Sequence, residues 1–149
     1  MISDELKERL DALAFEETTP WCSSCNVPAP EGRCRRCGSD DLMRYLKGEG
    51  ADWGVDWVIP ILLQHLSPID TEEAFADSVR ETYGETAQVG WIEVDTVDTI
   101  KAMDSISFEI AESEWLDSLT QDEQAMSPDN GGTWYWVHDV EALLEEHDL

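Results

Sequence analysis

Residues 21–38 read WCSSCNVPAPEGRCRRCG and contain all four cysteines of the 149-residue chain. The cysteines form two Cys-x-x-Cys pairs, Cys22 with Cys25 and Cys34 with Cys37, and eight residues separate the pairs. Each pair can place two sulfurs on one side of a metal ion, and two pairs complete the tetrahedral shell that zinc prefers. No cysteine is left over, so the thiols indicate a metal site in a reducing compartment rather than a disulfide framework.

The residues around the cysteines fit tight turns. Gly38 suits a turn that needs positive φ, and Pro28 and Pro30 stiffen the connection between the pairs. On these residues, segment 21–40 resembles the short double-knuckle zinc ribbons, in which two such pairs and a proline-bearing hairpin bind one zinc ion; this implies a fold and a metal but no biochemical role. Asn26 stands where such ribbons often have glycine, and asparagine tolerates left-handed backbone. Four thiolate ligands indicate one structural Zn²⁺, with an iron site of the rubredoxin type as the alternative.

The rest of the chain is strongly acidic. Its 34 acids and 9 bases give a net charge of −25, and residues 48–149 alone carry −23, whereas residues 22–47 carry +2. A negative charge of this size repels the nucleic-acid backbone, so we expect no direct nucleic-acid binding. No apolar run approaches the roughly 20 residues of a membrane span. We expect a cytoplasmic protein that does not contact a membrane.

The sequence predicts an α+β fold in three parts. Residues 1–19 form an N-terminal amphipathic helix capped by Ser3, and residues 20–47 form the small zinc ribbon. The glycines of residues 48–50 mark a linker. Residues 51–149 then form an acidic α+β domain with helices packed on a small antiparallel sheet.

Apolar spacing and caps predict the elements of this domain. Residues 52–66 read as its main hydrophobic helix, in which Pro60 forces a kink or a late start. The other predicted elements are a helix from the Asp70–Glu73 capping box to Gly84, a strand at 86–94, a short helix from Asp95 through Met103, a helix from Asp104 to about Leu119, a strand at 133–137 and a last helix from Asp139 through Leu144.

Carboxylates form rows on two of these helices. Glu73, Asp77 and Glu81 repeat every four residues, and Glu109 and Asp117 lie on the side of their helix away from the core. Together with the net charge, these rows make the chain resemble the acidic DNA mimics that inhibit restriction enzymes and other nucleic-acid-handling proteins. The resemblance is one of composition, and no sequence motif supports it. A solvated face, or adaptation to a salt-rich cytosol, is the alternative interpretation of the same acidity.

The tryptophans suggest both core and surface positions. Those expected in the core are Trp53, Trp57, Trp91 and Trp115. Trp134 and Trp136 lie in the strand at 133–137, and we expect one face of that strand to contact a partner, because such residues dominate binding hot spots.

Five of the nine basic residues of the chain gather near the cysteines. They are Arg33, Arg35, Arg36, Arg44 and Lys47. We interpret them as a patch that offsets the negative zinc tetrathiolate and docks on the acidic domain, with a nucleic-acid contact as the alternative.

No catalytic constellation accompanies these features. The three histidines are scattered, and neither a nucleophile elbow nor a phosphate-binding glycine loop is present. We therefore predict a non-enzymatic zinc-ribbon protein that binds another protein, in its most specific form a DNA-mimic inhibitor or regulator of a basic nucleic-acid-binding protein. The alternative is a zinc-ribbon adaptor in a transcription-type complex of a salt-adapted organism, and the third hypothesis is an enzyme of unrecognised type.

Overall fold

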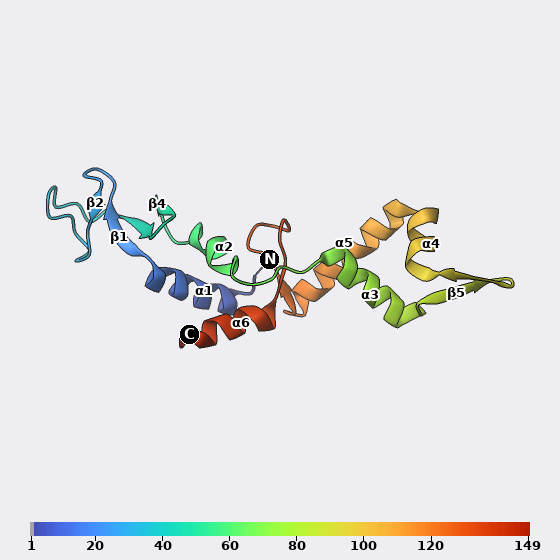
Figure 1. Ribbon diagram of the computed structural model, residues 1–149. Coiled ribbons are helices and arrows are strands. Elements are labelled where there is room, and N and C mark those ends of the chain that lie inside the picture. Colours follow the sequence, from blue (N-terminus) through green and yellow to red (C-terminus); the bar gives the residue numbers. More distant parts are fainter. Residues whose placement is uncertain (1) are drawn as a thin grey trace. The chain divides into compact units, whose positions relative to one another are not determined.

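The computed structural model describes residues 2–149, which form six helices and three small antiparallel sheets (Figure 1). The chain therefore belongs to the predicted α+β class. Its contacts divide it into two compact units. The ribbon unit comprises residues 2–67 and 138–149, and the inserted unit comprises residues 68–137. No helix among residues 2–149 is long and apolar enough to cross a membrane.

Three helices carry most of the buried apolar side chains of the ribbon unit. They are α1 (Asp4–Glu17), α2 (Val58–Leu63) and α6 (Val137–Glu146). Their buried side chains include Leu6, Leu10, Leu13, Val58, Leu63, Val140 and Leu144. As predicted, α1 begins at a serine cap, where the Ser3 hydroxyl accepts the N–H of Leu6 at 3.3 Å. Arg9 donates to the carbonyl of Leu149 at 3.0 Å, which ties the end of the chain to α1.

The cysteine segment of this unit is built on a four-stranded sheet in the order β2-β1-β3-β4. The strands are β1 (Thr19–Cys22), β2 (Val27–Pro28), β3 (Met43–Leu46) and β4 (Gly50–Asp52). Residues 48–50, predicted as a linker, instead make the turn from β3 into β4. The predicted long helix over residues 52–66 is also wrong. Asp52, its first predicted residue, belongs to β4, and the helix that does form, α2, has only six residues. Pro60 lies in the first turn of α2, where its missing N–H costs no helical hydrogen bond.

The unit boundaries differ from the predicted division into residues 1–19, 20–47 and 51–149. The predicted division followed chain order, whereas residues 138–149 belong to the same unit as the N-terminal helix. Nδ1 of His147, just after α6, lies 3.7 Å from a carboxylate oxygen of Glu17 at the end of α1.

The inserted unit contains α3 (Thr71–Tyr83), α4 (Thr96–Met103) and α5 (Ser105–Gln121). An aspartate caps each helix, as predicted. Asp70, Asp95 and Asp104 accept the N–H groups of Glu73, Asp98 and Ser107 at 3.2, 2.9 and 3.0 Å, respectively. Gly84 ends α3 with φ 94°, and its N–H donates to the carbonyl of Arg80.

Strands of the inserted unit differ from the prediction. Residues 86–94 are not one strand but the hairpin of β5 (Thr86–Val89) and β6 (Ile92–Asp95), which continues from α3 into α4 (Figure 1). The predicted strand at 133–137 shrinks to β8 (Tyr135–Trp136), which pairs with the unpredicted β7 (Ala125–Met126). The last helix starts at Val137, two residues before the predicted Asp139.

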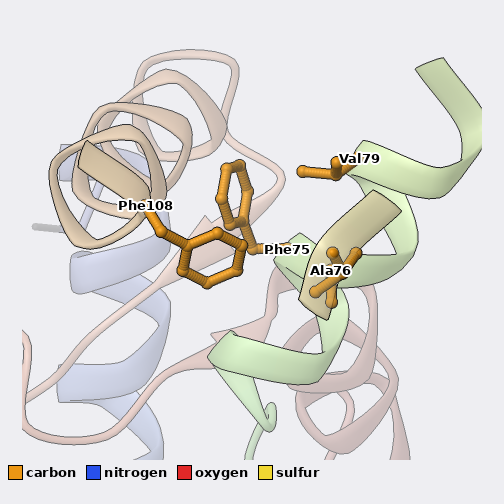
Figure 2. Packing of buried hydrophobic residues seen from close by; sticks show 5 residues of the cluster. Phe75, Ala76, Val79 and Phe108 are labelled. Atoms are coloured by element: carbon orange, nitrogen blue, oxygen red, sulfur yellow. The ribbon is translucent and has the colours of Figure 1, made fainter. Parts of the chain in front are cut away.

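The core of the inserted unit lies between its three helices. Figure 2 shows the rings of Phe75 from α3 and Phe108 from α5 turned toward each other, and their centroids are 5.1 Å apart in an edge-on arrangement. Ala76, Val79 and Val97 complete this buried cluster. A second cluster consists of Leu116, Ala125 and Trp134.

Candidate metal centre and exposed surfaces

Two turns of the ribbon carry the four cysteines. Cys22 is the last residue of β1, and Cys25 lies in the turn that leads to β2. Cys34 and Cys37 lie in a turn of the long connection between β2 and β3. Pairing of β1 with both β2 and β3 holds the two turns on one end of the sheet.

The backbone of both turns is arranged around the sulfurs. Asn26 has φ 54° and Gly38 has φ 73°, as the sequence predicted for the residue that follows each pair. The N–H of Gly38 donates to the carbonyl of Cys34 at 2.8 Å, which closes the second turn. Inside it, the N–H of Arg36 donates to Sγ of Cys34 at 3.4 Å. Such N–H···S contacts stabilise a thiolate at the position a metal ligand needs.

The four sulfurs form one compact cluster. They all lie within 4.8 Å of one another, and Sγ of Cys22 is 3.6 Å from Sγ of Cys37. All four thiols are free. A tetrahedral shell with metal–sulfur bonds of about 2.3 Å has sulfurs about 3.8 Å apart, so the spacing fits a single ion. Cys22 and Cys34 are buried, while Cys37 is exposed, so this cluster can hold a metal ion near the protein surface.

The thiols of the cluster differ in acidity. N–H groups of Cys37 and Arg36 donate to the sulfur of Cys34 and lower the pKa of that thiol to about 6. Hydrogen bonding with Cys37, together with burial, raises the pKa of Cys25 to about 12. Four thiolates this close repel one another, and a divalent cation is the partner that allows all of them to ionise.

The basic residues near the cluster have separate roles. Arg44, in β3, donates to the carbonyl oxygens of Phe15 and Thr18 at 2.8 Å, and its guanidinium lies 4.0 Å from the centroid of the Phe15 ring. Arg44 therefore caps the C-terminal end of α1. Arg35 pairs with Glu31, and Arg36 is exposed.

The carboxylate row on α3 is partly neutralised. Arg80 donates to Glu73 at 3.1 Å and to Asp77 at 2.9 Å. Both carboxylates are thus ion-paired on the same helix, which offsets the repulsion that the spacing alone predicts. Glu81, and on α5 Glu109 and Asp117, are exposed.

The tryptophans require corrections. Trp134 is only 6% exposed and packs in the second cluster, and Trp136 packs against the same cluster, so this strand does not present an aromatic face. Conversely, Trp91 is 93% exposed and Trp53 is 51% exposed, although both were predicted in the core. Trp115 does contribute to the core, with its ring 5.6 Å from that of Phe75.

The largest exposed apolar set was not predicted. Residues 2–149 expose nine large apolar side chains, and seven of them belong to the inserted unit between residues 83 and 110. This apolar set is Tyr83, Val89, Trp91, Ile92, Met103, Ile106 and Ile110. The sequence signal was a second stripe on α5, in which Ile106 and Ile110 stand four residues apart beside the core stripe of Phe108 and Ala111.

Known proteins give no guide to this site, because no family model matches the chain and the comparisons with curated proteins and with solved structures found no match.

Proposed function

We propose that the cysteine cluster binds one zinc ion and that this ion is structural. The support is the donor set, four sulfurs within 4.8 Å of one another on two N–H-lined turns. Four protein ligands fill a tetrahedral shell and leave no position for substrate or water. The ion supplies charge neutralisation and a crosslink between the two turns, which are too small to form a core of their own.

Metal analysis of the purified protein tests this proposal. We expect about one zinc per chain by elemental analysis, and the intense thiolate-to-metal absorption of a tetrahedral Cys₄ site after exchange with Co²⁺. The double variant Cys34→Ser/Cys37→Ser should lose both signals. One iron per chain with a red chromophore would show an iron site of the rubredoxin type instead of zinc. Metal binding that survives in the double variant would show that the four cysteines are not the ligands.

We further propose that the protein is a non-enzymatic binding protein and that its contact surface is the apolar set of the inserted unit. The observation that carries this proposal is that seven large apolar side chains are exposed within one 28-residue stretch, with Trp91 exposed to 93%. Exposed apolar side chains concentrated in this way are typical of interaction sites, and aromatic side chains among them are typical hot spots.

The charge of the inserted unit indicates which partner fits. It carries 17 acids and two bases, a net charge of −15, and both bases already form ion pairs with acids of the same unit. Anionic membranes and nucleic acids are repelled by such a surface, whereas basic proteins are attracted. In its more specific form the proposal is that the partner is a basic nucleic-acid-binding protein. Duplex DNA would then compete with this protein for the partner and displace it.

Affinity capture from the source cells tests the binding function. The variant Trp91→Ser/Met103→Ser removes two members of the apolar set, and Phe15→Ser/Trp53→Ser removes two exposed side chains from the ribbon unit as a matched control. We expect a specific partner to be captured by the wild type and the control and lost by the first variant. An identical set of captured proteins for all three would refute the assignment.

A second candidate contact surface lies on the ribbon. Trp21 stacks on Tyr45 with centroids 4.8 Å apart, beside an open pocket of about 500 Å³ that Met43 and Asn26 also line. This face corresponds to the adaptor hypothesis. A partner that is lost with Met43→Glu but kept with Trp91→Ser/Met103→Ser would favour it.

A further inference from the structure

An apolar pocket opens between α3, α4 and α5 in the inserted unit. Its volume is about 290 Å³, and its lining includes Phe75, Val79, Tyr83, Ile100, Phe108 and Ala111. Phe75, Val79 and Phe108 are the same side chains that form the buried cluster in Figure 2. The pocket is therefore an opening into the core of this unit.

The pocket adjoins the exposed apolar set. Tyr83 lines the pocket and is 73% exposed, so it belongs to both. On α5, Ile106 and Ile110 immediately precede the lining residues Ser107 and Ala111. A partner that covers Tyr83 would therefore also reach the mouth of the pocket.

Size and charge restrict what the pocket can hold. Sites for drug-sized ligands begin at roughly 300 Å³, so this volume suits one large apolar side chain better than a free cofactor. Glu81 follows the lining residue Ser78 by three positions, and Glu114 follows Ala111 by three, which places a carboxylate one helical turn from the pocket on two helices. A second copy of this chain would bring another net charge of −25 to the surface, so self-association is opposed.

We infer that this pocket accepts one large apolar side chain from a lysine- or arginine-rich amphipathic segment of the partner protein. The inference rests on the proposed binding function and specifies its partner. The apolar side chain of the partner packs against the core cluster, and the cations beside it pair with Glu81 and Glu114. Both contacts are needed, since apolar burial supplies affinity and the charges select among apolar segments.

The probe for this inference is an 18-residue synthetic peptide of lysine and leucine, patterned as an amphipathic helix. Its controls are a scrambled peptide of the same composition and a peptide with glutamate in place of lysine. We expect the first peptide alone to bind in fluorescence anisotropy titrations, and to shift the methyl NMR signals of Val79 and Ile100. Equal binding of the scrambled or acidic peptide would overturn the inference.

Two matched pairs of variants locate the contact. Ser107→Leu fills the pocket from α5, whereas Ser118→Leu adds the same side chain at an exposed serine of α5 outside it. We expect the first to weaken peptide binding about tenfold or more and the second to change it by less than about twofold. Glu81→Gln/Glu114→Gln should weaken binding more, and reduce its salt dependence more, than Glu8→Gln/Glu145→Gln in the ribbon unit.

The outcomes separate this inference from the function on which it rests. Shifts at Ile106 and Ile110 without shifts at Val79 and Ile100 overturn the pocket but leave the apolar set as a binding surface. Unchanged affinity in Ser107→Leu, with the fold intact by NMR, overturns the pocket as well. The capture experiment with Trp91→Ser/Met103→Ser decides the binding function by itself.

Discussion

Arg44 links the ribbon sheet to the first helix. Its guanidinium satisfies the carbonyl oxygens of Phe15 and Thr18 and also contacts the hydroxyl of Thr18 at 3.0 Å. The last carbonyls of a helix have no partner within the helix, so a cation here satisfies them and also complements the helix dipole.

Replacement of Arg44 by methionine keeps the length of the side chain and removes these hydrogen bonds. We expect the free energy of unfolding to fall by about 1 to 2 kcal/mol, because the part-buried hydrogen bond to the carbonyl of Thr18 and the exposed one to the carbonyl of Phe15 both lose their charged donor. Chemical denaturation measures the loss. Arg36→Met, at an exposed arginine of the same ribbon, should change stability by less than about 0.5 kcal/mol; equal effects of the two would show that Arg44 acts only through its charge.

Asp129 holds the loop between β7 and β8. Its Oδ1 accepts the N–H of Thr133 at 2.8 Å and the hydroxyl of Ser127 at 2.9 Å. The N–H of Thr133 is the main reason that the pKa of this carboxyl lies below 3.8. The folded state therefore favours the carboxylate relative to the unfolded chain.

The sign of this shift gives a pH dependence. A carboxyl with a lowered folded pKa stabilises the protein above its unfolded pKa, and that contribution disappears as the pH falls through the folded value. We expect Asp129→Asn to be less stable than the wild type at pH 7, with a difference that shrinks below pH 3.8. Denaturation at several pH values tests this, with Asp117→Asn as an exposed control. A difference that does not vary with pH would mean that the charge of Asp129 is irrelevant.

At the scale of elements, the hairpin between α3 and α4 depends on one glycine. Gly90 and Trp91 form its two-residue loop, and Gly90 alone of the two has positive φ, at 64°. This pattern fits a type II′ turn, whose first loop residue is glycine. The turn fixes the register in which Val89 pairs with Ile92 and exposes Trp91 at the tip.

Gly90→Ala isolates the conformational demand of this turn. A Cβ on Gly90 meets no atom within 4 Å, so any loss of stability comes from the backbone rather than from a clash. We expect the free energy of unfolding to fall by about 1 kcal/mol or more, while Gln88→Ala, in the adjoining strand, changes it by less than about 0.5 kcal/mol. Thermal unfolding measures both. A neutral Gly90→Ala would contradict the assigned turn.

The elements that the sequence predicted correctly are those with local signals. Asp70, Asp95 and Asp104 mark three helix starts, because a cap needs only a side-chain oxygen three residues before an N–H. The hairpin was missed because Gly-Trp is a weaker turn signal than Asn-Gly. The strands β4 and β7 were missed because two or three residues pair only through partners elsewhere in the chain.

The candidate metal centre was predictable for the same reason, since its ligands and turns occupy one short segment. The pocket and the apolar set were not, because they depend on how α3, α4 and α5 pack together and on the hairpin of β5 and β6, which the sequence did not predict. The stripe of α5 that contains Phe108 is buried, as its spacing predicts, but the spacing does not tell whether Ile106 and Ile110 are covered by another element, and both are exposed.

At the scale of the whole molecule, repulsion between like charges opposes folding. The net charge is −25, and the two bases of the inserted unit cannot compensate its 17 acids. Added salt screens such repulsion, because the Debye length falls to about 10 Å at 0.1 M and charges farther apart than this interact little. We expect a protein that is folded at low ionic strength and whose melting temperature rises by several degrees between 0.02 and 0.5 M sodium chloride. Folding only in molar salt would instead support adaptation to a salt-rich cytosol, and a melting temperature that falls with salt would mean that ion pairs dominate.

The division into two units predicts how the molecule responds to metal removal. The ribbon strands, residues 19–52, contain the cysteine cluster, whereas the inserted unit has its own buried core around Phe75 and Phe108. Because four neighbouring thiols without a cation regain protons and lose their crosslink, we expect a strong chelator to unfold the ribbon. Amide NMR should then show collapsed signals for residues 19–52 and unchanged signals for residues 68–137. Added Zn²⁺ should restore the ribbon, and Cys34→Ser/Cys37→Ser should reproduce the chelated spectrum without recovery. Loss of both sets of signals together would show that the two units fold as one, and an unchanged ribbon would show that the metal is not structural.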